Sequence, residues 1–321
     1  MADHVAKRVT LARMPSGSEM TTTVHTYDGR ASGPTVYVQA AQHGQEVNGT
    51  EVCRRLHADL REASLAGRVV VVPVADPLTF DRVSYTTPES LDSVNPNMNR
   101  VWPGDATGTL HERMAARLWE YVETADAVVD LHTGSPEMFT HAVFLEGDAE
   151  SRELAEAFGT DLLLSEEAGE DADVEWTDRD FDGKLRVAAT REGIPAVTPE
   201  LAHNKQVVED AVETGVVGTL NVLRYCGVLD GDPVENGDPT LARNHLGTVT
   251  AVDSGLFVPD TDRALGDRVE AGERVGTLYD PATYERLQAV ETDRAGILYA
   301  LTTEATVTAG ESLVRVALLR E

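Results

Sequence analysis

Short apolar runs alternate with longer amphipathic stretches in the N-terminal part of the chain. The apolar runs are rich in β-branched residues and occupy 35–40, 68–75 and 127–134, and the amphipathic stretches occupy 48–60 and 109–125. This alternation predicts an α/β fold with a largely parallel sheet flanked by helices. The runs are apolar throughout, as is typical of strands that helices cover on both faces.

The character of the sequence changes near residue 235. The segment DGDPVENGDPT at 230–240 is rich in Gly, Pro and Asp, a composition typical of linkers. Beyond it, short strand-like runs are separated by turn signals and show little helical periodicity. The sequence therefore predicts a catalytic α/β domain over 1–235 and a small all-β domain over 236–321.

Three residues that could bind a metal lie at predicted strand ends. His43 and Glu46, in QHGQE, follow the run TVYVQA where a helix begins, and His132 follows AVVD. Ligands of such sheets gather beyond the carboxyl ends of the strands, so these side chains are expected to converge. Two neutral imidazoles and one carboxylate are the protein ligands of a catalytic zinc site. Asp130 could orient a ligand histidine.

The His-x-x-acid spacing is weak evidence by itself, because it also occurs at His25 and Asp28. Those two residues lie in HTYDGR, where Asp-Gly indicates a turn between strands, and are interpreted as structural. For His132 the alternative is a buried histidine that is hydrogen-bonded to a backbone carbonyl. Position at the sheet edge, rather than spacing, supports the metal site.

Further candidate residues occur in the segments between these elements. Glu200, near the end of GIPAVTPEL, is a candidate general base, with a solvated surface acid as the alternative. In the long polar loop 76–105, Asn99 and Arg100 offer an amide beside a guanidinium whose planar fork suits a substrate carboxylate. The acidic stretch 165–183 is interpreted as a solvated loop without a role in the chemistry.

The chain is strongly acidic, with 55 acidic against 27 basic residues and a formal net charge of −28. This balance disfavours nucleic acid and anionic membrane surfaces as partners. Lysine occurs only at positions 7, 184 and 205. Such a carboxylate-rich surface is typical of a halophile, where molar salt shortens the Debye length to about 3 Å. An acidic protein of a mesophile is the alternative.

Other features of the composition predict a cytoplasmic protein. The two cysteines, Cys53 and Cys226, are too few for a disulfide framework or a cysteine-rich zinc site. The N-terminus lacks the apolar run of a signal peptide, and no apolar stretch approaches the ~18 residues of a membrane span. A homo-oligomer stays possible.

Taken in order, the motifs HGQE, NMNRVWPG, DLHTG and GIPAVTPEL resemble those of the succinylglutamate desuccinylase and aspartoacylase family. The resemblance covers most of the first 235 residues. It implies a zinc carboxypeptidase-like fold used for deacylation, with one Zn²⁺ per chain. The implied residues are the metal ligands His43, Glu46 and His132, the base Glu200, and a substrate-carboxylate clamp of Asn99 and Arg100.

The sequence departs from the family pattern at two places. Asp76 stands where members usually carry asparagine before proline, and no arginine occupies the expected place near Tyr85. Arg82 is the candidate replacement for stabilising the tetrahedral oxyanion.

The C-terminal segment resembles the biotinyl/lipoyl-like β domain, chiefly through GDRVEAGERVG and TAGESLVRVA. Carrier domains of this type attach their cofactor to a lysine, and no lysine follows Lys205, which excludes covalent biotin or lipoate.

The expected activity is hydrolysis of the amide of a small N-acyl amino acid, acetylated or succinylated. A zinc carboxypeptidase acting on short peptides and a non-catalytic metal-containing binding protein are the alternatives.

Overall fold

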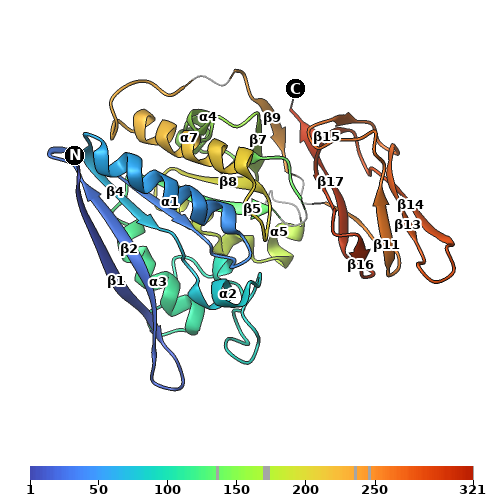
Figure 1. The fold of residues 1–321 in the computed structure, drawn as a ribbon, viewed down its shortest axis with the longest axis horizontal. Helices are drawn as coiled ribbons and strands as arrows, with labels where there is room; N and C mark the ends of the chain where they lie inside the picture. The colour runs from blue at the N-terminus through green and yellow to red at the C-terminus, as the bar shows by residue number, and fades with distance from the viewer. Residues whose placement is uncertain (135–136, 169–173, 235–236, 245–246, 321) are drawn as a thin grey trace.

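A large mixed sheet with helices on both faces forms most of the molecule, and a small antiparallel sheet stands at its C-terminal end (Figure 1). This computed structural model describes residues 1–134, 137–168, 174–234, 237–244 and 247–320. The predicted fold class, a largely parallel α/β sheet with a small C-terminal β unit, is confirmed.

Within the described residues the large sheet has thirteen strands. In spatial order they are β1 (Asp3–Arg13), β2 (Glu19–Asp28), β4 (Ala66–Val72), β3 (Ala31–Ala40), β5 (Ala127–Gly134), β8 (Ala196–His203), β6 (His141–Leu145), β7 (Leu162–Glu166), β9 (Thr240–Arg243), β17 (Ser312–Leu319), β15 (Gly296–Leu301) and β12 (Arg268–Val269), with β10 (Val249–Thr250) on β17. The central strands β4, β3, β5 and β8 are parallel, whereas β6 runs antiparallel to β8. Parallel strands align their carboxyl ends, so the loops after β3, β5 and β8 meet at one edge.

Helices bury both faces of the central strands. One face packs against α1 (Val47–Glu62), α4 (Ala149–Phe158) and α7 (Glu209–Tyr225), and the other against α3 (Leu110–Val122) and α6 (Leu185–Arg191). Alternate residues of β3 serve both cores, Val36 and Val38 under α1 and Tyr37 on the opposite face. This explains why the strand sequences are apolar without alternation.

Shorter helices lie in the connections: α2 (Pro77–Arg82), α5 (Val174–Asp178), and the 3₁₀ turns η1 (Met98–Arg100) and η3 (Phe181–Gly183). Asp76 caps α2, because its Oδ1 accepts hydrogen bonds from the backbone N–H of Leu78 at 2.9 Å and of Thr79 at 3.3 Å. Its Oδ2 lies 3.2 Å from Nε2 of buried His111. The aspartate at this position therefore holds the start of the long loop in place.

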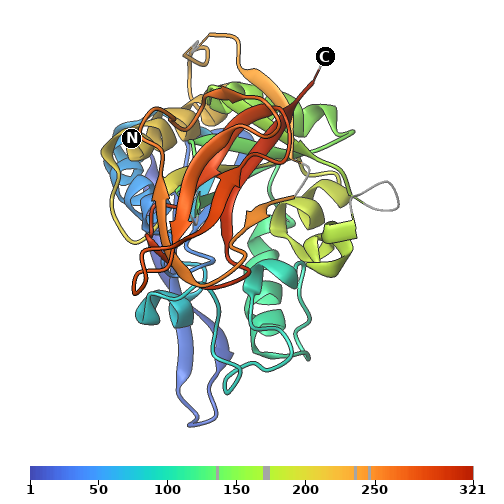
Figure 2. The same cartoon turned by 90° about the vertical axis from the view of Figure 1, so that its right-hand side faces the viewer.

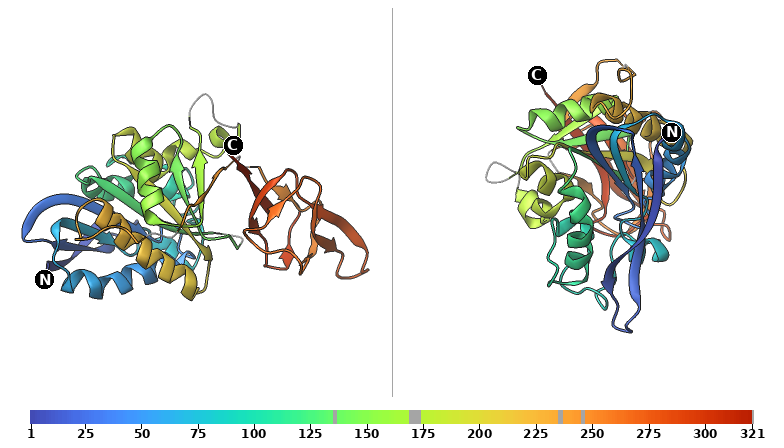
Figure 3. Two further views of the ribbon diagram at one scale, coloured as in Figure 1. Left: turned by 90° about the horizontal axis from the view of Figure 1, so that it is seen from above. Right: turned by 90° about the vertical axis from the view of Figure 1, so that its left-hand side faces the viewer.

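The C-terminal β unit has its own core and continues the large sheet. Its second sheet has the order β14 (Arg286–Glu291), β13 (Arg274–Tyr279), β11 (Gly255–Pro259) and β16 (Thr306–Val307). Phe257, Leu278 and Leu313 are among the residues buried between the two sheets. Figure 2 shows these strands facing the viewer, and Figure 3 shows the unit extending from the end of the α/β part.

Strand β9 joins the two parts, since it pairs in parallel with β7 and antiparallel with β17. The predicted boundary near residue 235 lies outside the described residues, and the division into 1–235 and 236–321 stays a prediction. None of the helices in the described part of the chain has the length and apolar character that crossing a bilayer requires.

Candidate active site

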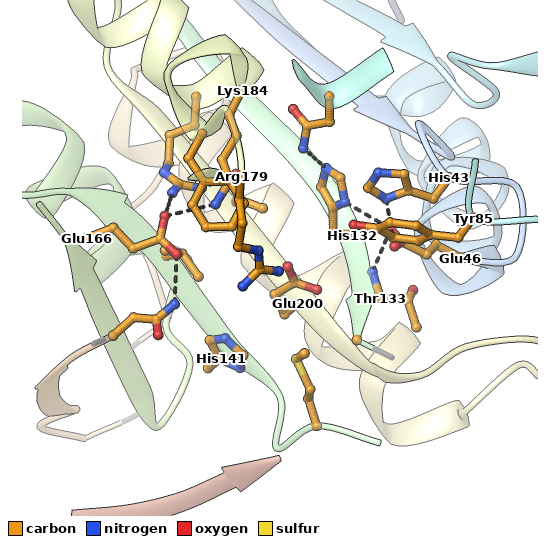
Figure 4. A pocket seen from close by; sticks show the side chains of 18 of the residues that line it. His43, Glu46, Tyr85, His132, Thr133, His141, Glu166, Arg179, Lys184 and Glu200 are labelled. Carbon is orange, nitrogen blue, oxygen red and sulfur yellow. Dashed lines mark hydrogen bonds and ion pairs between the residues drawn. The ribbon is translucent and has the colours of Figure 1, made fainter. Parts of the chain in front are cut away.

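The structure brings His43, Glu46 and His132 together at the carboxyl ends of β3 and β5. His43 and Glu46 lie in the turn between β3 and α1, and His132 lies within β5 near its end. All three side chains are buried, and one ligand atom from each lies within 4.8 Å of the others. Gly44 keeps this turn tight, because a Cβ at that position would collide with the backbone of Thr79. These residues form a candidate metal site (Figure 4).

Glu46 stands between the two histidines. Its Oε1 lies 2.8 Å from Nδ1 of His43, and its Oε2 lies 2.9 Å from Nδ1 of His132. The same Oε2 accepts a hydrogen bond from the backbone N–H of Thr133 at 3.2 Å. Burial opposes ionisation of Glu46, but the two imidazoles outweigh it and lower the pKa of this carboxyl to about 2. Glu46 is therefore an anionic ligand candidate at neutral pH.

Asp130 fixes the orientation of His132 from behind. Its Oδ2 lies 3.0 Å from Nε2 of His132, which is the contact that the sequence led us to expect. Gln39 and Gln42 donate hydrogen bonds to the same carboxylate. His132, with these two amides, holds the pKa of Asp130 below its usual range despite burial. With Nε2 occupied by Asp130, the Nδ1 of His132 is the nitrogen that faces Glu46.

Glu200 lies beside this group, in the middle of β8. The register of the sheet pairs it with His132 of β5 on one side and with His141 of β6 on the other. Burial raises the pKa of the Glu200 carboxyl to about 7. Figure 4 shows Glu200 between the candidate metal site and a second charged group around Glu166.

That second group consists of a buried carboxylate and two cations. Glu166, at the end of β7, pairs with Lys184 Nζ at 3.1 Å and with the guanidinium of Arg186, and Nδ2 of Asn244 donates to it at 2.8 Å. Burial opposes ionisation of Glu166, but Lys184 and Arg186 lower its pKa to about 2. Burial, helped by Arg186 and Arg100, lowers the pKa of Lys184 to about 7.

One cavity of about 320 Å³ contains both groups. It is lined by residues of the α/β part and also by Tyr299 and Arg315 from the C-terminal β unit. Three buried polar atoms of residues that line it, Oγ1 of Thr133, Nε of Arg186 and Nε of Arg315, have no hydrogen-bond partner among the described residues. Such atoms are rare in folded proteins and can contact a bound molecule.

The structure places Asn99 and Arg100 at the cavity wall as well. Asn99 Oδ1 accepts from the backbone N–H of Leu185 at 3.0 Å, and Nδ2 lies 3.4 Å from Nε2 of His132. Arg100 donates from Nε to the carbonyl of Arg179 at 2.7 Å and from Nη1 to its neighbour's carbonyl at 2.6 Å.

Arg82, the candidate replacement for the missing arginine, does not line the cavity. It donates from Nη1 to the carbonyl of Leu78 at 3.1 Å within its own helix. Tyr85 does line the cavity, and its ring stacks on His43 with ring centroids 4.0 Å apart. Cations that could face a substrate oxygen come from other parts of the chain.

The interpretation of 165–183 as a solvated loop without a role is wrong for three residues. Glu166, Arg179 and Phe181 line the cavity, and Phe181 is 3% exposed. Residues 169–173 of this stretch lie outside the described residues. The acidic composition concealed an apolar signal, because Trp176 and Phe181 pack edge to face in the core with Val187.

The sequence reasoning also missed Lys184, Arg186, His141, Tyr299 and Arg315. One available signal was that Lys184 is one of three lysines in the chain. Tyr299 and Arg315 could not be found from local pattern, because contacts between segments distant in sequence bring the C-terminal unit to the cavity. These contacts include the pairing of β9 with β17 and the bridge between Met138 and Ala300.

The structure thus combines a mixed α/β sheet with a buried His-Glu-His group, a candidate metal site, at the carboxyl ends of its parallel strands. The family model for the succinylglutamate desuccinylase/aspartoacylase catalytic domain matches residues 32–226. The chain belongs to this family.

Similar proteins support this assignment. The N-α-acetyl-L-2,4-diaminobutyric acid deacetylase of Halomonas elongata is 28% identical over 301 residues, which cover 90% of this chain and 83% of the relative. The structure of a succinylglutamate desuccinylase/aspartoacylase from Rhodobacter sphaeroides is 25% identical, with a TM-score of 0.81 and coverage of 99% of this chain and 95% of that one. The product-bound ectoine utilization protein EutE (DoeB) of Ruegeria pomeroyi has the same fold, with a TM-score of 0.83 at 20% identity and the same coverage.

Proposed function

We propose that this protein is a zinc-dependent hydrolase that cleaves the amide bond of small N-acyl amino acids. The observation that carries the proposal is that one cavity contains a buried His-Glu-His group, a carboxylate beside it and a cationic wall opposite. The family is one of metal-dependent deacylases, and the relative from Halomonas elongata is named for deacetylation of an N-acetylated amino acid.

The donor set of the candidate site fits zinc. His43 and His132 offer imidazole nitrogens and Glu46 offers a carboxylate, which is the ligand set of two-His, one-Glu zinc hydrolases. All three are buried, so an ion bound there would be shielded from competing solvent on the protein side. When bound, zinc lowers the pKa of a coordinated water to about 7 and polarises a carbonyl oxygen.

Glu200 is proposed as the general base. Its pKa of about 7, raised by burial, lets it accept a proton from the attacking water and return it at neutral pH. In the proposed reaction the water oxygen bonds to the acyl carbon, the C–N bond breaks, and Glu200 delivers the proton to the leaving nitrogen. The products are a free carboxylic acid and an amino acid.

Arg100 with Asn99 is proposed to bind the substrate carboxylate. Arg100 lines the cavity, and its two hydrogen bonds to backbone carbonyls engage Nε and Nη1, so that Nη2 has no hydrogen bond to any described residue. Lys184 and Arg186 add positive charge to the same wall. A guanidinium held in this way is pre-oriented for a carboxylate.

The proposal is tested with untagged, zinc-loaded protein and a panel of N-acetyl and N-succinyl amino acids, N-α-acetyl-L-2,4-diaminobutyrate among them, against a matched set of dipeptides. Release of the free amino acid from N-acyl substrates, with little cleavage of dipeptides, is expected. Preferential cleavage of dipeptides would instead identify a carboxypeptidase. Absence of hydrolysis across the panel by protein that retains zinc would contradict an enzymatic function.

A further inference from the structure

A second group of histidines lies away from the cavity, beneath the C-terminal half of α1. His4 is on β1, His25 is on β2, and His57 is on α1. The antiparallel register sets His4 opposite Tyr27 and Ala6 opposite His25, so both histidines share the sheet face that Tyr27 presents to the core under α1. Because β1 and β2 form the outer edge of the sheet, this group is separated from β3 by β4.

The three rings are packed closely together. The Nε2 of His4 lies 3.1 Å from Nδ1 of His25, and one ligand atom from each of the three histidines lies within 4.8 Å of the others. The ring of His57 meets that of His4 edge to face, with centroids 4.8 Å apart. Three imidazoles from three elements therefore each place a ring nitrogen close to those of the other two.

The surroundings leave these nitrogens available. Among the described residues, His4 and His25 have no ring hydrogen bond except the one between them. His57 has one, between its Nδ1 and the hydroxyl oxygen of Tyr27, which lie 2.7 Å apart. That bond leaves Nε2 of His57 as the nitrogen for a further partner. Tyr27 thus holds one ring nitrogen of His57 by a hydrogen bond, as Asp130 does for His132.

Both burial and repulsion from neighbouring histidines lower the pKa of His4 and of His25, which favours their neutral forms. Burial lowers the pKa of His4, with further lowering from His57 and Arg61, and burial also lowers the pKa of His25. Neutral imidazole is the form that binds metal ions, since a protonated ring has no lone pair to offer. All three side chains are partly exposed, so an ion can enter from solvent and complete its coordination with water.

We propose that His4, His25 and His57 form a second metal site, which takes a divalent transition metal ion of the Zn²⁺, Ni²⁺ or Cu²⁺ type and is independent of the proposed reaction. Imidazole ligands suit these ions, whereas Mg²⁺ and Ca²⁺ require oxygen ligands. The bound ion ties the β1–β2 hairpin at the edge of the sheet to α1. It cross-links elements that are distant in sequence and thereby stabilises their packing.

The test counts metal ions bound by untagged protein, so that no added histidines contribute. Wild-type protein is saturated with Zn²⁺, dialysed, and analysed for zinc per chain, beside His4→Ala, His132→Ala and the control His203→Ala. His203 is a partly exposed histidine outside both clusters, with its Nδ1 2.7 Å from the carbonyl of Asn204. Two ions are expected in the wild type and the control, and one in each of the other variants.

His4→Ala with the same zinc content as the wild type would overturn the proposal, as would a wild type whose single ion is lost in His132→Ala. An ion lost only in His132→Ala tests the active site and not the second site, so failure of one proposal can be distinguished from failure of the other.

Calorimetric titration of Tyr27→Phe with Zn²⁺ gives a second readout, because this change keeps the ring in the core. Affinity of the second ion is expected to fall about 10-fold, and unchanged affinity counts against the site. If His4→Ala does not fold, His57→Asn replaces it in the same measurement.

Discussion

The two histidine clusters of this protein use the same side chain in different surroundings. His43 and His132 lie at the carboxyl ends of parallel strands, are buried, and share a carboxylate, Glu46. His4 and His25 lie at the antiparallel edge of the sheet and His57 lies on α1 above them. All three are partly exposed, and Tyr27 forms a hydrogen bond with His57. Only the first cluster has a general-base candidate and a cationic wall beside it. The comparison indicates that the proposed catalytic site differs from the proposed structural one in the groups around it as well as in its ligands.

The largest expected effect separates the active-site cluster from an unrelated histidine. His132→Ala should remove both the active-site metal and detectable deacylation, because it deletes a ligand that Asp130 and Glu46 hold in place. His203→Ala should keep the rate within twofold of the wild type, roughly the limit of a surface change. Steady-state assays with zinc analysis on both variants check this. Equal activity of the two variants would remove the basis for the assigned site.

The next effect concerns the general-base candidate, which has no counterpart in the group of His4, His25 and His57. Glu200→Gln should lower kcat by about 10² to 10⁴-fold while zinc content stays at the wild-type level, because the amide cannot accept the proton. The pKa of Glu200, about 7, also predicts that kcat/KM rises with pH through that region in the wild type. Turnover that is unaffected by this substitution would exclude Glu200 as the base.

A smaller effect compares the two groups that orient a histidine. Asp130→Asn should weaken zinc binding at the active site by about 100-fold, near the upper end for such contacts, because it removes a charged acceptor. Tyr27→Phe should weaken the second ion by only about 10-fold, since the phenol is neutral. Competition with a chelator of known affinity measures both. A larger effect for Tyr27→Phe would reverse the ranking of the two sites.

The smallest effect tests the cationic wall. Because burial lowers the pKa of Lys184 to about 7, its ammonium is present below that pH and is lost above it. KM for an N-acyl amino acid should therefore rise by about tenfold between about pH 6 and pH 9, as one charge-assisted contact is lost. Lys184→Arg, which stays charged, should flatten this profile. A profile that is equally steep in the variant would show that Lys184 does not bind the substrate.

Much of the fold could be predicted from sequence because its strands and helices carry local signals. The run at 35–40 has three consecutive apolar residues from Val36 to Val38, since Val36 and Tyr37 face different cores, and the sequence alone indicated a strand covered on both faces. The position of His43, Glu46 and His132 after such strands was enough to bring them together, because parallel strands align their carboxyl ends. These features depend on residues near in sequence.

The rest of the site depends on contacts between distant segments. Glu166 and Arg179 lie in a stretch whose acidity indicated only a solvated loop. Arg315 reaches the cavity through contacts of the C-terminal unit with β9 and with Met138. The sequence indicates only a structural role for His25, and strand register and helix packing bring it close to His4 and His57. The sequence by itself determined the α/β class, the family motifs and the three ligand candidates, because each depends on residues that are close together in the sequence. Only the tertiary structure decided which charges surround them and which histidines form a second cluster, because those neighbours are set by how separate elements pack.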